Sequence, residues 1–312
     1  MFDKVKFWIN RDSFNSTQII NRLDEANTQV NTQTGEMCIY GSLDGLKVSI
    51  YSGGVSIVGS LPKYLYDSNV YALDRASTKQ AVEKLSDTLQ FRADEAKVTA
   101  VEFGTSFLMS RNVRDYLLKL GDMPRLERYH FTASTLYYKG VGKTQPKVFA
   151  FYDKILDAKD KGMDYPKNLE KANLLRYEMR YRQRVAQQLG VPEITASTLY
   201  QKPFYSMMIQ RYQDSYLSIT KKRQLKADIM SNIKTVGDAL DVLVARLLIQ
   251  TDQTQITAFL DELKESKAFE DRKNYSRLKK KIQEITAKAD TTEASDLIKE
   301  LDDDIKNVGA YV

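Results

Sequence analysis

The amino-acid sequence predicts an α+β protein, with an antiparallel sheet and flanking helices followed by an all-α C-terminal region. Three observations support this prediction. Short β-rich runs separated by glycine turns fill much of the first half of the chain. Apolar residues at helical spacing interrupt those runs, and from Thr195 onward the spacing is helical. We therefore expect a sheet domain over residues 1–192 and a helical region over residues 193–312, with the break close to Gly190–Pro192.

The elements expected in the first domain are separated by clear turn signals. Gly45 and the pair Gly53-Gly54 read as hairpin turns between three strands. Strands are expected at Val5–Ile9, Met37–Tyr40, Leu46–Tyr51, Gly54–Val58, Lys97–Leu108, Arg128–Tyr138, Lys147–Leu156 and Leu174–Tyr181. Helices are expected at Ser16–Asn27, Thr78–Leu89 and Val113–Leu120.

The C-terminal region reads as a series of helices. Val236–Leu248 is strongly apolar and is predicted to be buried. The other segments are charged and amphipathic, and they cover Ile256–Phe269, Tyr275–Ala287 and Ser295–Val308. The run from Arg272 to Lys281 is the most basic part of the tail, and it is either a solvated helix face or a surface for duplex DNA. Recruitment of a helicase and formation of a homodimer are further hypotheses for this region.

The charge of the chain suits a polyanionic partner. Its 47 Lys and Arg against 41 Asp and Glu give a net charge of +6. Residues 251–312 carry 11 Lys and Arg and 14 Asp and Glu, so the positive charge is concentrated in residues 1–250. The single cysteine, Cys38, excludes an intramolecular disulfide, and the single histidine, His130, excludes a Cys/His zinc site. A signal-peptide core and apolar runs of about 18 residues are both missing, so a cytoplasmic location is expected.

The expected strand Lys147–Leu156 carries a candidate nucleophile. Strand alternation places Tyr152 and Lys154 on one face, two residues apart. A tyrosine that attacks phosphorus must lose its proton, and a nearby cation favours the phenolate. The same cation can hold the phosphate. The competing interpretation is an amphipathic strand with an ordinary surface lysine.

The last strand of the domain carries a candidate acid or metal ligand. Alternation places Glu178 between Arg176 and Arg180 on one face. The carboxylate is a candidate metal ligand or general base, and the competing interpretation is a self-neutralised, solvated sheet face. Glu102 lies among apolar residues, and a half-buried carboxylate there needs a partner or a metal. His130 is a ligand, a general base or a structural residue.

The segment Gly140–Thr144 looks like part of a phosphate-binding loop but fails that test. The first glycine of the motif would fall at Tyr137, and the segment joins two strands rather than a strand and a helix. We interpret it as a β-turn with basic residues. Lys143, together with Lys147, is a candidate DNA contact.

Four blocks of this sequence, in order, resemble the phage and plasmid replication proteins of the gene II/gene X family. The resemblance extends from about residue 60 to about residue 192, and the third block also resembles a group of plasmid rolling-circle initiators. The blocks are Ser60–Leu65 with Asn69-Val70-Tyr71, then Val98–Phe103, then Val148–Lys154 with its Phe-Tyr-Asp-Lys, then Leu175–Arg180.

The resemblance implies a rolling-circle replication initiator that nicks one DNA strand at an origin. Tyr152 stands where these families have their nucleophile, so it would join the 5′ phosphate and leave a 3′ hydroxyl for a host polymerase. Residues 1–192 would form a catalytic domain like that of the HUH nickases. Lys154 would bind the phosphate and lower the pKa of the phenol, and Arg176 and Arg180 would contact the DNA backbone.

A divalent ion, Mg²⁺ or Mn²⁺, is also implied, held by Glu178 and Glu102 with His130. The chain departs from the family's pattern in the second block, where Glu102 replaces the usual Asp and Ala100 the usual Arg. The extra methylene of Glu shifts the ligand geometry. A single histidine also cannot form the His-hydrophobe-His motif of HUH nickases, so the carboxylates would have to hold the metal.

Three other classes of protein compete with the nickase. A non-cleaving initiator that binds and melts an origin fits the charge and size equally well. A structural or RNA-binding α+β protein would bind polyanions without metal dependence and without a covalent adduct. A tyrosine recombinase is disfavoured, because its nucleophile lies near the C-terminus whereas Tyr152 lies mid-chain on an expected strand.

Overall fold

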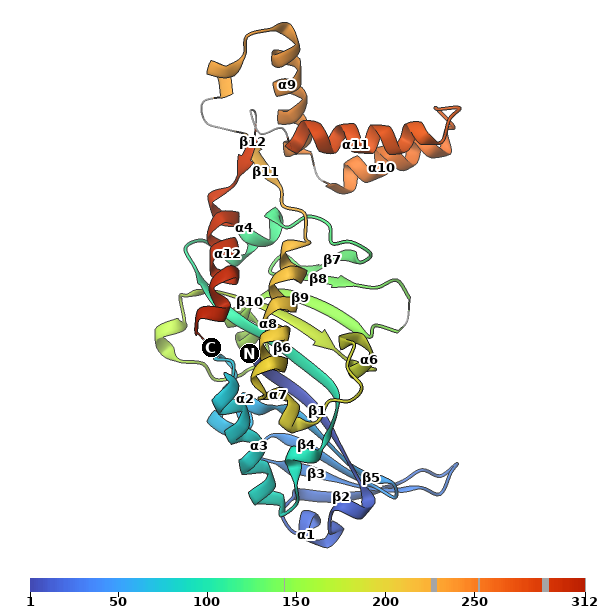
Figure 1. The fold of residues 1–312 in the computed structure, drawn as a ribbon, viewed down its shortest axis with the longest axis vertical. Helices are drawn as coiled ribbons and strands as arrows, with labels where there is room; N and C mark the ends of the chain where they lie inside the picture. The colour runs from blue at the N-terminus through green and yellow to red at the C-terminus, as the bar shows by residue number, and fades with distance from the viewer. Residues whose placement is uncertain (143, 226–228, 252, 288–291, 312) are drawn as a thin grey trace.

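The computed structural model describes residues 1–142, 144–225, 229–251, 253–287 and 292–311 (Figure 1). Within these residues one ten-stranded antiparallel sheet has the order β2-β3-β4-β5-β1-β6-β10-β9-β8-β7, so the predicted α+β class is confirmed. Its strands are β1 (Phe2–Asn10), β2 (Asp24–Val30), β3 (Met37–Leu43), β4 (Leu46–Tyr51), β5 (Gly54–Ser60), β6 (Lys97–Met109), β7 (Glu127–Thr132), β8 (Thr135–Lys139), β9 (Lys147–Asp153) and β10 (Asn173–Tyr181).

The helices form two groups (Figure 1). Those along the sheet are α1 (Ser16–Ile20), α2 (Leu61–Tyr66), α3 (Arg75–Leu89), α4 (Val113–Lys119), α5 (Lys154–Asp160), α6 (Val185–Leu189), α7 (Ala196–Leu199), α8 (Lys202–Leu217) and α12 (Asp296–Asn307). Those that project beyond it are α9 (Val236–Gln250), α10 (Gln253–Glu265) and α11 (Lys273–Ala287). A short strand pair, β11 (Arg223–Leu225) and β12 (Thr292–Ala294), leads to the projecting group. None of the helices within the described ranges is long and apolar enough to cross a membrane.

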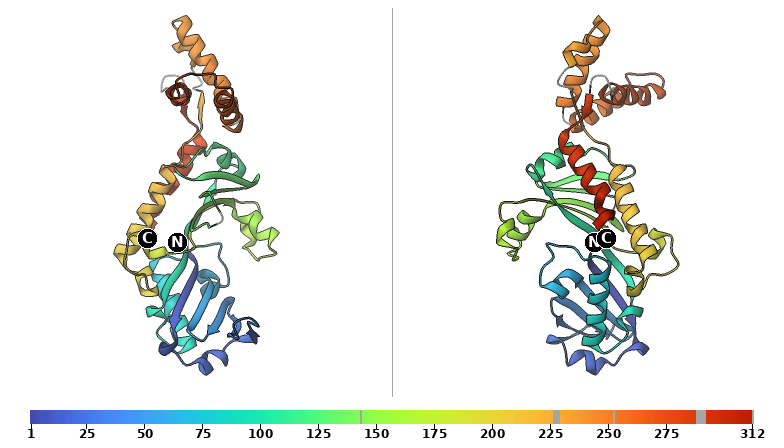
Figure 2. Two further views of the ribbon diagram at one scale, coloured as in Figure 1. Left: turned by 90° about the vertical axis from the view of Figure 1, so that its right-hand side faces the viewer. Right: turned by 60° about the vertical axis from the view of Figure 1, so that its left-hand side comes forward.

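Different helices pack against the two faces of the sheet. Figure 2 shows α8 and α12 on one side and α5 on the other. On the α8 side, alternate residues of β10 are buried in the main core. The Tyr177 ring stacks on Phe151 at a centroid distance of 4.2 Å, and its hydroxyl donates to the carbonyl of Tyr212 at 3.3 Å. The remaining residues of β10 therefore lie on the α5 side.

Two predicted strands are wrong in extent, and local side chains explain both. The strand expected over Arg128–Tyr138 is a hairpin of β7 and β8, in which the backbone N–H of Ser134 donates to the hydroxyl of Thr132. The strand expected over Lys147–Leu156 ends at Asp153. The carboxylate of Asp153 accepts from the first backbone N–H groups of α5 and so begins a helix there.

The expected helix Ser16–Asn27 is also wrong in extent, because only α1 is helical and β2 follows it. The helical C-terminal region is confirmed, with β11 and β12 as a strand pair within it. Its helix α9 was predicted to be buried, yet it exposes Val236, Leu240 and Leu247. The domain boundary after residue 192 stays a prediction. Helices α7, α8 and α12 all follow that point and contribute to the core of the sheet.

Candidate active site

Three neighbouring strands bring the main candidate residues to one face of the sheet. In the register of β6, β10 and β9, Arg176 lies opposite Tyr152, and Arg180 lies opposite Glu102. Glu178 lies between these two rows on β10. Residues opposite each other in antiparallel strands share a face, so these five side chains all lie on the α5 side.

Arg176 is fully buried and is shared by two carboxylates. Its Nε donates to Oε1 of Glu178 at 2.9 Å, and its Nη2 donates to Oδ2 of Asp3 at 2.8 Å. The hydroxyl of Ser60 donates to the other oxygen of Asp3. A buried charge is tolerated only with such partners. The interpretation of this face as solvated is therefore wrong, because Arg176, Glu178 and Asp3 are all buried.

Glu178 is the centre of the cluster. Its Oε1 accepts from the Tyr152 hydroxyl at 2.8 Å as well as from Arg176, and its Oε2 accepts from Nε and Nη2 of Arg180 at 2.9 and 2.7 Å. Burial raises the pKa of Glu178, but Arg180 and Arg176 lower it by more, so its pKa lies below the ordinary carboxyl value. The carboxylate is therefore ionised at neutral pH.

Tyr152 is buried beside this anion. Burial and the charge of Glu178 raise the pKa of the Tyr152 phenol well above its usual value of 10, and Arg176 and Arg180 oppose the shift by less. The net shift is upward, and the predicted lowering of this pKa by Lys154 stays a prediction. The phenol is protonated and donates its proton toward Glu178.

Arg180 and Glu102 connect the cluster to solvent. Their side chains are 17% and 24% exposed, and Arg180 Nε lies 3.9 Å from Glu102 Oε1. Burial and the charge of Glu178 raise the pKa of Glu102, and Arg180 opposes this. The Cζ atom of Arg180 lies 5.9 Å from the ring centroid of Tyr152. A ligand from solvent therefore meets Arg180 and Glu102 before it meets Glu178, Arg176 or Tyr152.

Lys154 begins α5 and is buried next to the cluster. Its Nζ donates to Oδ1 of Asn69 at 3.0 Å. Burial and the charge of Arg176 lower the pKa of Lys154 to about 8, while Asp3 and Glu178 raise it. A cation with one side-chain hydrogen bond next to Arg176 can share the charge of an incoming phosphate.

The other predicted residues are not brought to this cluster. His130 lies opposite Leu136 in the β7–β8 ladder, in the row that continues to Phe151 on the α8 side. Lys147 starts β9 on that same side, with its Nζ 4.6 Å from the ring centroid of Phe149. Lys143 lies outside the described residues.

The residues predicted to bind a metal do not fit together as ligands in this arrangement. His130 is on the opposite face from Glu178, and both oxygens of Glu178 already accept hydrogen bonds from arginine. Across the ranges that the structure describes, no three His, Cys, Asp or Glu side chains are grouped to hold a metal. The requirement for a divalent ion stays a prediction.

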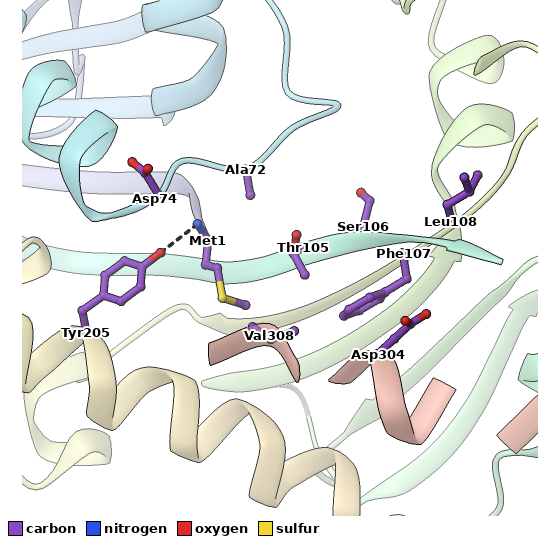
Figure 3. Close-up of a pocket in the computed structure, with 10 residues that line it drawn as sticks. All are labelled: Met1, Ala72, Asp74, Thr105, Ser106, Phe107, Leu108, Tyr205, Asp304 and Val308. Atoms are coloured by element: carbon purple, nitrogen blue, oxygen red, sulfur yellow. Dashed lines mark hydrogen bonds between the residues drawn. The ribbon is translucent and has the colours of Figure 1, made fainter. Parts of the chain in front are cut away.

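A pocket of about 420 Å³ lies between β6, the start of the chain and the end of α12, and it borders this cluster at Ser106, whose hydroxyl accepts from Nη1 of Arg176 at 3.3 Å (Figure 3). Met1 and Tyr205 line one side, where the amine of Met1 donates to the Tyr205 hydroxyl at 3.2 Å. Phe107 and Asp304 line the other side. None of the predicted site residues lines this pocket.

Two members of the site were missed from the sequence. Asp3 gave no periodic signal, because a register irregularity between Phe2 and Val5 leaves two successive residues of β1 buried. Asn69 could have been found, since it belongs to the first block of the resemblance. In the structure its side chain accepts a hydrogen bond from Lys154.

The fold and the site define a class of protein. It has an antiparallel sheet in which a tyrosine hydroxyl donates a hydrogen bond to a carboxylate, and that carboxylate lies between two arginines. A family model for the N-terminal part of the replication-associated gene II protein of phages matches residues 1–213. The chain belongs to this family and is a replication initiator of the filamentous-phage gene II type. The match covers the whole ten-stranded sheet and ends within α8. No curated protein matches the chain.

Proposed function

We propose that this initiator nicks one DNA strand at a replication origin by transesterification to Tyr152. Gene II-type replication proteins are in general nicking endonucleases. The observation that carries the proposal for this chain is the 2.8 Å hydrogen bond from the Tyr152 hydroxyl to Glu178. A nucleophile and a proton acceptor within hydrogen-bond reach, next to cations that suit a phosphate, form the minimal set for this chemistry.

The scissile phosphate enters at Arg180, because this arginine is the partly exposed one. A phosphate oxygen is a strong acceptor and competes with Glu178 for the guanidinium. As Arg180 turns to the phosphate, Glu178 loses part of the positive charge that lowers its pKa. The carboxylate then becomes a better proton acceptor for Tyr152, so substrate binding and activation of the nucleophile are coupled.

The chemical step exchanges one phosphodiester for another. The phenolic proton of Tyr152 passes to Oε1 of Glu178, and the phenolic oxygen bonds to phosphorus. The bond between phosphorus and the 3′ oxygen breaks, and that oxygen leaves as a hydroxyl with a proton from solvent. Arg180 and Lys154 hold the charge of the phosphate during the exchange. The tyrosyl ester keeps the phosphodiester bond energy, so the reverse reaction can rejoin a strand.

The test is formation of a covalent adduct on an end-labelled single-stranded oligonucleotide that carries the origin, or on a random-sequence pool. Wild type is compared with Tyr152→Phe on a denaturing gel. Tyr181→Phe is the matched control, because Tyr181 is buried on the other face of β10 and its hydroxyl has no hydrogen-bond partner among the described residues. Each protein is run with Mg²⁺, with Mn²⁺ and with EDTA, which tests the predicted ion directly.

We expect an adduct with wild type and Tyr181→Phe, and none with Tyr152→Phe. An adduct that survives in Tyr152→Phe would assign the nucleophile to another tyrosine. If wild type binds the origin but forms no adduct with either metal, the proposal fails in favour of a non-cleaving initiator.

A further inference from the structure

The β7–β8 hairpin exposes a cluster of aromatic side chains. Tyr129 and Phe131 on β7 are 44% and 65% exposed, and Tyr137 on β8 is partly buried between them and β9. The rings of Phe131 and Tyr137 meet edge to face at a centroid distance of 6.3 Å. We call Tyr129, Phe131 and Tyr137 the aromatic platform. Large apolar groups gathered on a surface mark a binding site more often than chance.

The aromatic platform lies on the same face of the sheet as the candidate nucleophile. The register runs from Tyr129 to Tyr137, then to Ala150 and Glu178. Residues in one such row share a face. The platform therefore continues the surface of the cluster toward the edge strand β7 and does not belong to the core under α8.

Arg180 joins the platform to the cluster. Its Cζ atom lies 5.8 Å from the ring centroid of Tyr137 and 5.9 Å from that of Tyr152. The aromatic rings thus begin beside the arginine that is the entry point for a phosphate. A strand whose phosphate reaches Arg180 has its neighbouring bases within reach of the platform.

Positive charge alternates with the rings. The Nζ of Lys139 lies 4.1 Å from the ring centroid of Tyr129, and Arg180 flanks Tyr137 on the other side. Aromatic rings with interleaved cations are the composition that binds single-stranded nucleic acid, since bases stack on the rings and phosphates meet the cations. Bases in a duplex are already stacked on each other and cannot use such rings.

We infer that the aromatic platform stacks unpaired bases of single-stranded DNA next to the scissile phosphate. This inference rests on the proposed function, because it places a second contact for the strand that Tyr152 cuts. It assigns a binding role to Tyr129, Phe131 and Tyr137 and separates it from the chemical role of Tyr152.

The test measures binding of a fluorescent oligo(dT) of about 16 nucleotides by anisotropy, with the full chain. The variants are Tyr129→Ala and Phe131→Ala, each alone, and Tyr129→Phe retains the ring as a rescue. Tyr40→Ala is the matched control, because Tyr40 is 43% exposed on β3, at the far end of the same sheet. A labelled duplex of the same length is measured in parallel.

Loss of one stacked base weakens binding roughly 5- to 150-fold. We expect a loss in this range for each alanine variant on oligo(dT), near wild-type affinity for Tyr129→Phe and Tyr40→Ala, and an unchanged affinity for duplex. Equal affinities of all variants for oligo(dT) would overturn the inference. So would a change of oligomeric state without a change in DNA affinity, since the platform would then bind a second copy of the chain.

The adduct assay keeps the two proposals distinguishable. If the platform variants lose oligo(dT) affinity while wild type forms no adduct, the base-stacking role of the platform stands and the nickase fails. If wild type forms the adduct at Tyr152 while the platform variants bind normally, the nickase stands and the inference fails.

Discussion

Replacement of Glu178 by glutamine retains the shape of the side chain and removes its charge. The carboxylate lies between Arg176 and Arg180 and accepts hydrogen bonds from both. In Glu178→Gln each guanidinium keeps one other carboxylate as a neighbour, yet the buried site holds one negative charge fewer. We therefore expect the variant to fold with reduced stability and to form the DNA adduct far more slowly.

The size of the stability loss can be worked from the contacts. Removal of one partner of a buried ion pair costs about 3 to 5 kcal/mol. We expect Glu178→Gln to lower the free energy of unfolding by about 3 kcal/mol, because the amide oxygen still accepts one hydrogen bond and because two other carboxylates remain. The free energy of unfolding of a domain is usually about 5 to 15 kcal/mol, so the variant should still be folded at room temperature.

The pH dependence provides the sharper check. Folding lowers the pKa of Glu178, so its stabilisation is complete above the ordinary carboxyl pKa of about 4.3 and is lost as the pH falls through the folded-state value. The difference in the free energy of unfolding between wild type and variant should be largest near neutral pH and should shrink in acid. Urea denaturation at a series of pH values measures it.

An exposed glutamate supplies the control for this series. Glu36→Gln should change the free energy of unfolding by less than about 0.5 kcal/mol, because Glu36 is exposed. A loss for Glu178→Gln as small as that of the control at about pH 7 would refute the reasoning. A large loss that does not shrink in acid would refute the ionic part of it.

Two further predictions concern the strand next to Glu178. Gly104→Ala should destabilise the protein by about 2 kcal/mol or more, because a Cβ there would lie 2.8 Å from the Cα of Glu178. Thermal unfolding compares it with Gly140→Ala, where nothing lies within 4 Å of the added carbon, and equal losses would contradict the prediction. Glu102→Gln should stabilise the protein above neutral pH. Folding raises the pKa of Glu102, so its charge costs stability as the pH rises, by about 1.4 kcal/mol per pKa unit. Urea midpoints on either side of neutrality check this, and a variant no more stable than wild type at the higher pH would count against it.

The strands could be predicted well from sequence wherever alternation and glycine turns coincide. Leu46–Tyr51 agrees with β4 residue for residue, and the predicted placement of Arg176, Glu178 and Arg180 on one face of β10 is confirmed. The turn of the β7–β8 hairpin was missed because it carries Ala133 and Ser134 in place of the usual Gly or Asn. The order of strands was beyond reach, since β1 pairs with β5 and β6 through contacts that are distant along the chain.

The candidate site was predictable in its members more than in its environment. The resemblance picked out Tyr152 and Glu178, and the structure places them in hydrogen-bond contact. Alternation alone could not say whether the sheet face that carries Tyr152 and Glu178 is solvated, because solvation depends on which other elements pack against that face. His130 was grouped with them by chemistry, although the ladder places it on the other face. Which face of the sheet His130 lies on depends on the register between β7 and β8, and the sequence alone does not specify that register.

Stability alone does not explain why this protein buries a cluster of charged side chains. A buried ion-pair network is often no more stabilising than apolar residues of similar volume, and it is costly once one member is lost. Under the proposed function, this buried network has a role in controlling the reactivity of Tyr152. Burial and the charge of Glu178 keep Tyr152 protonated, and therefore unreactive, before DNA binds. On that proposal, a phosphate that draws Arg180 away leaves Glu178 a stronger proton acceptor, so Tyr152 would be activated when a DNA strand is in place to receive it.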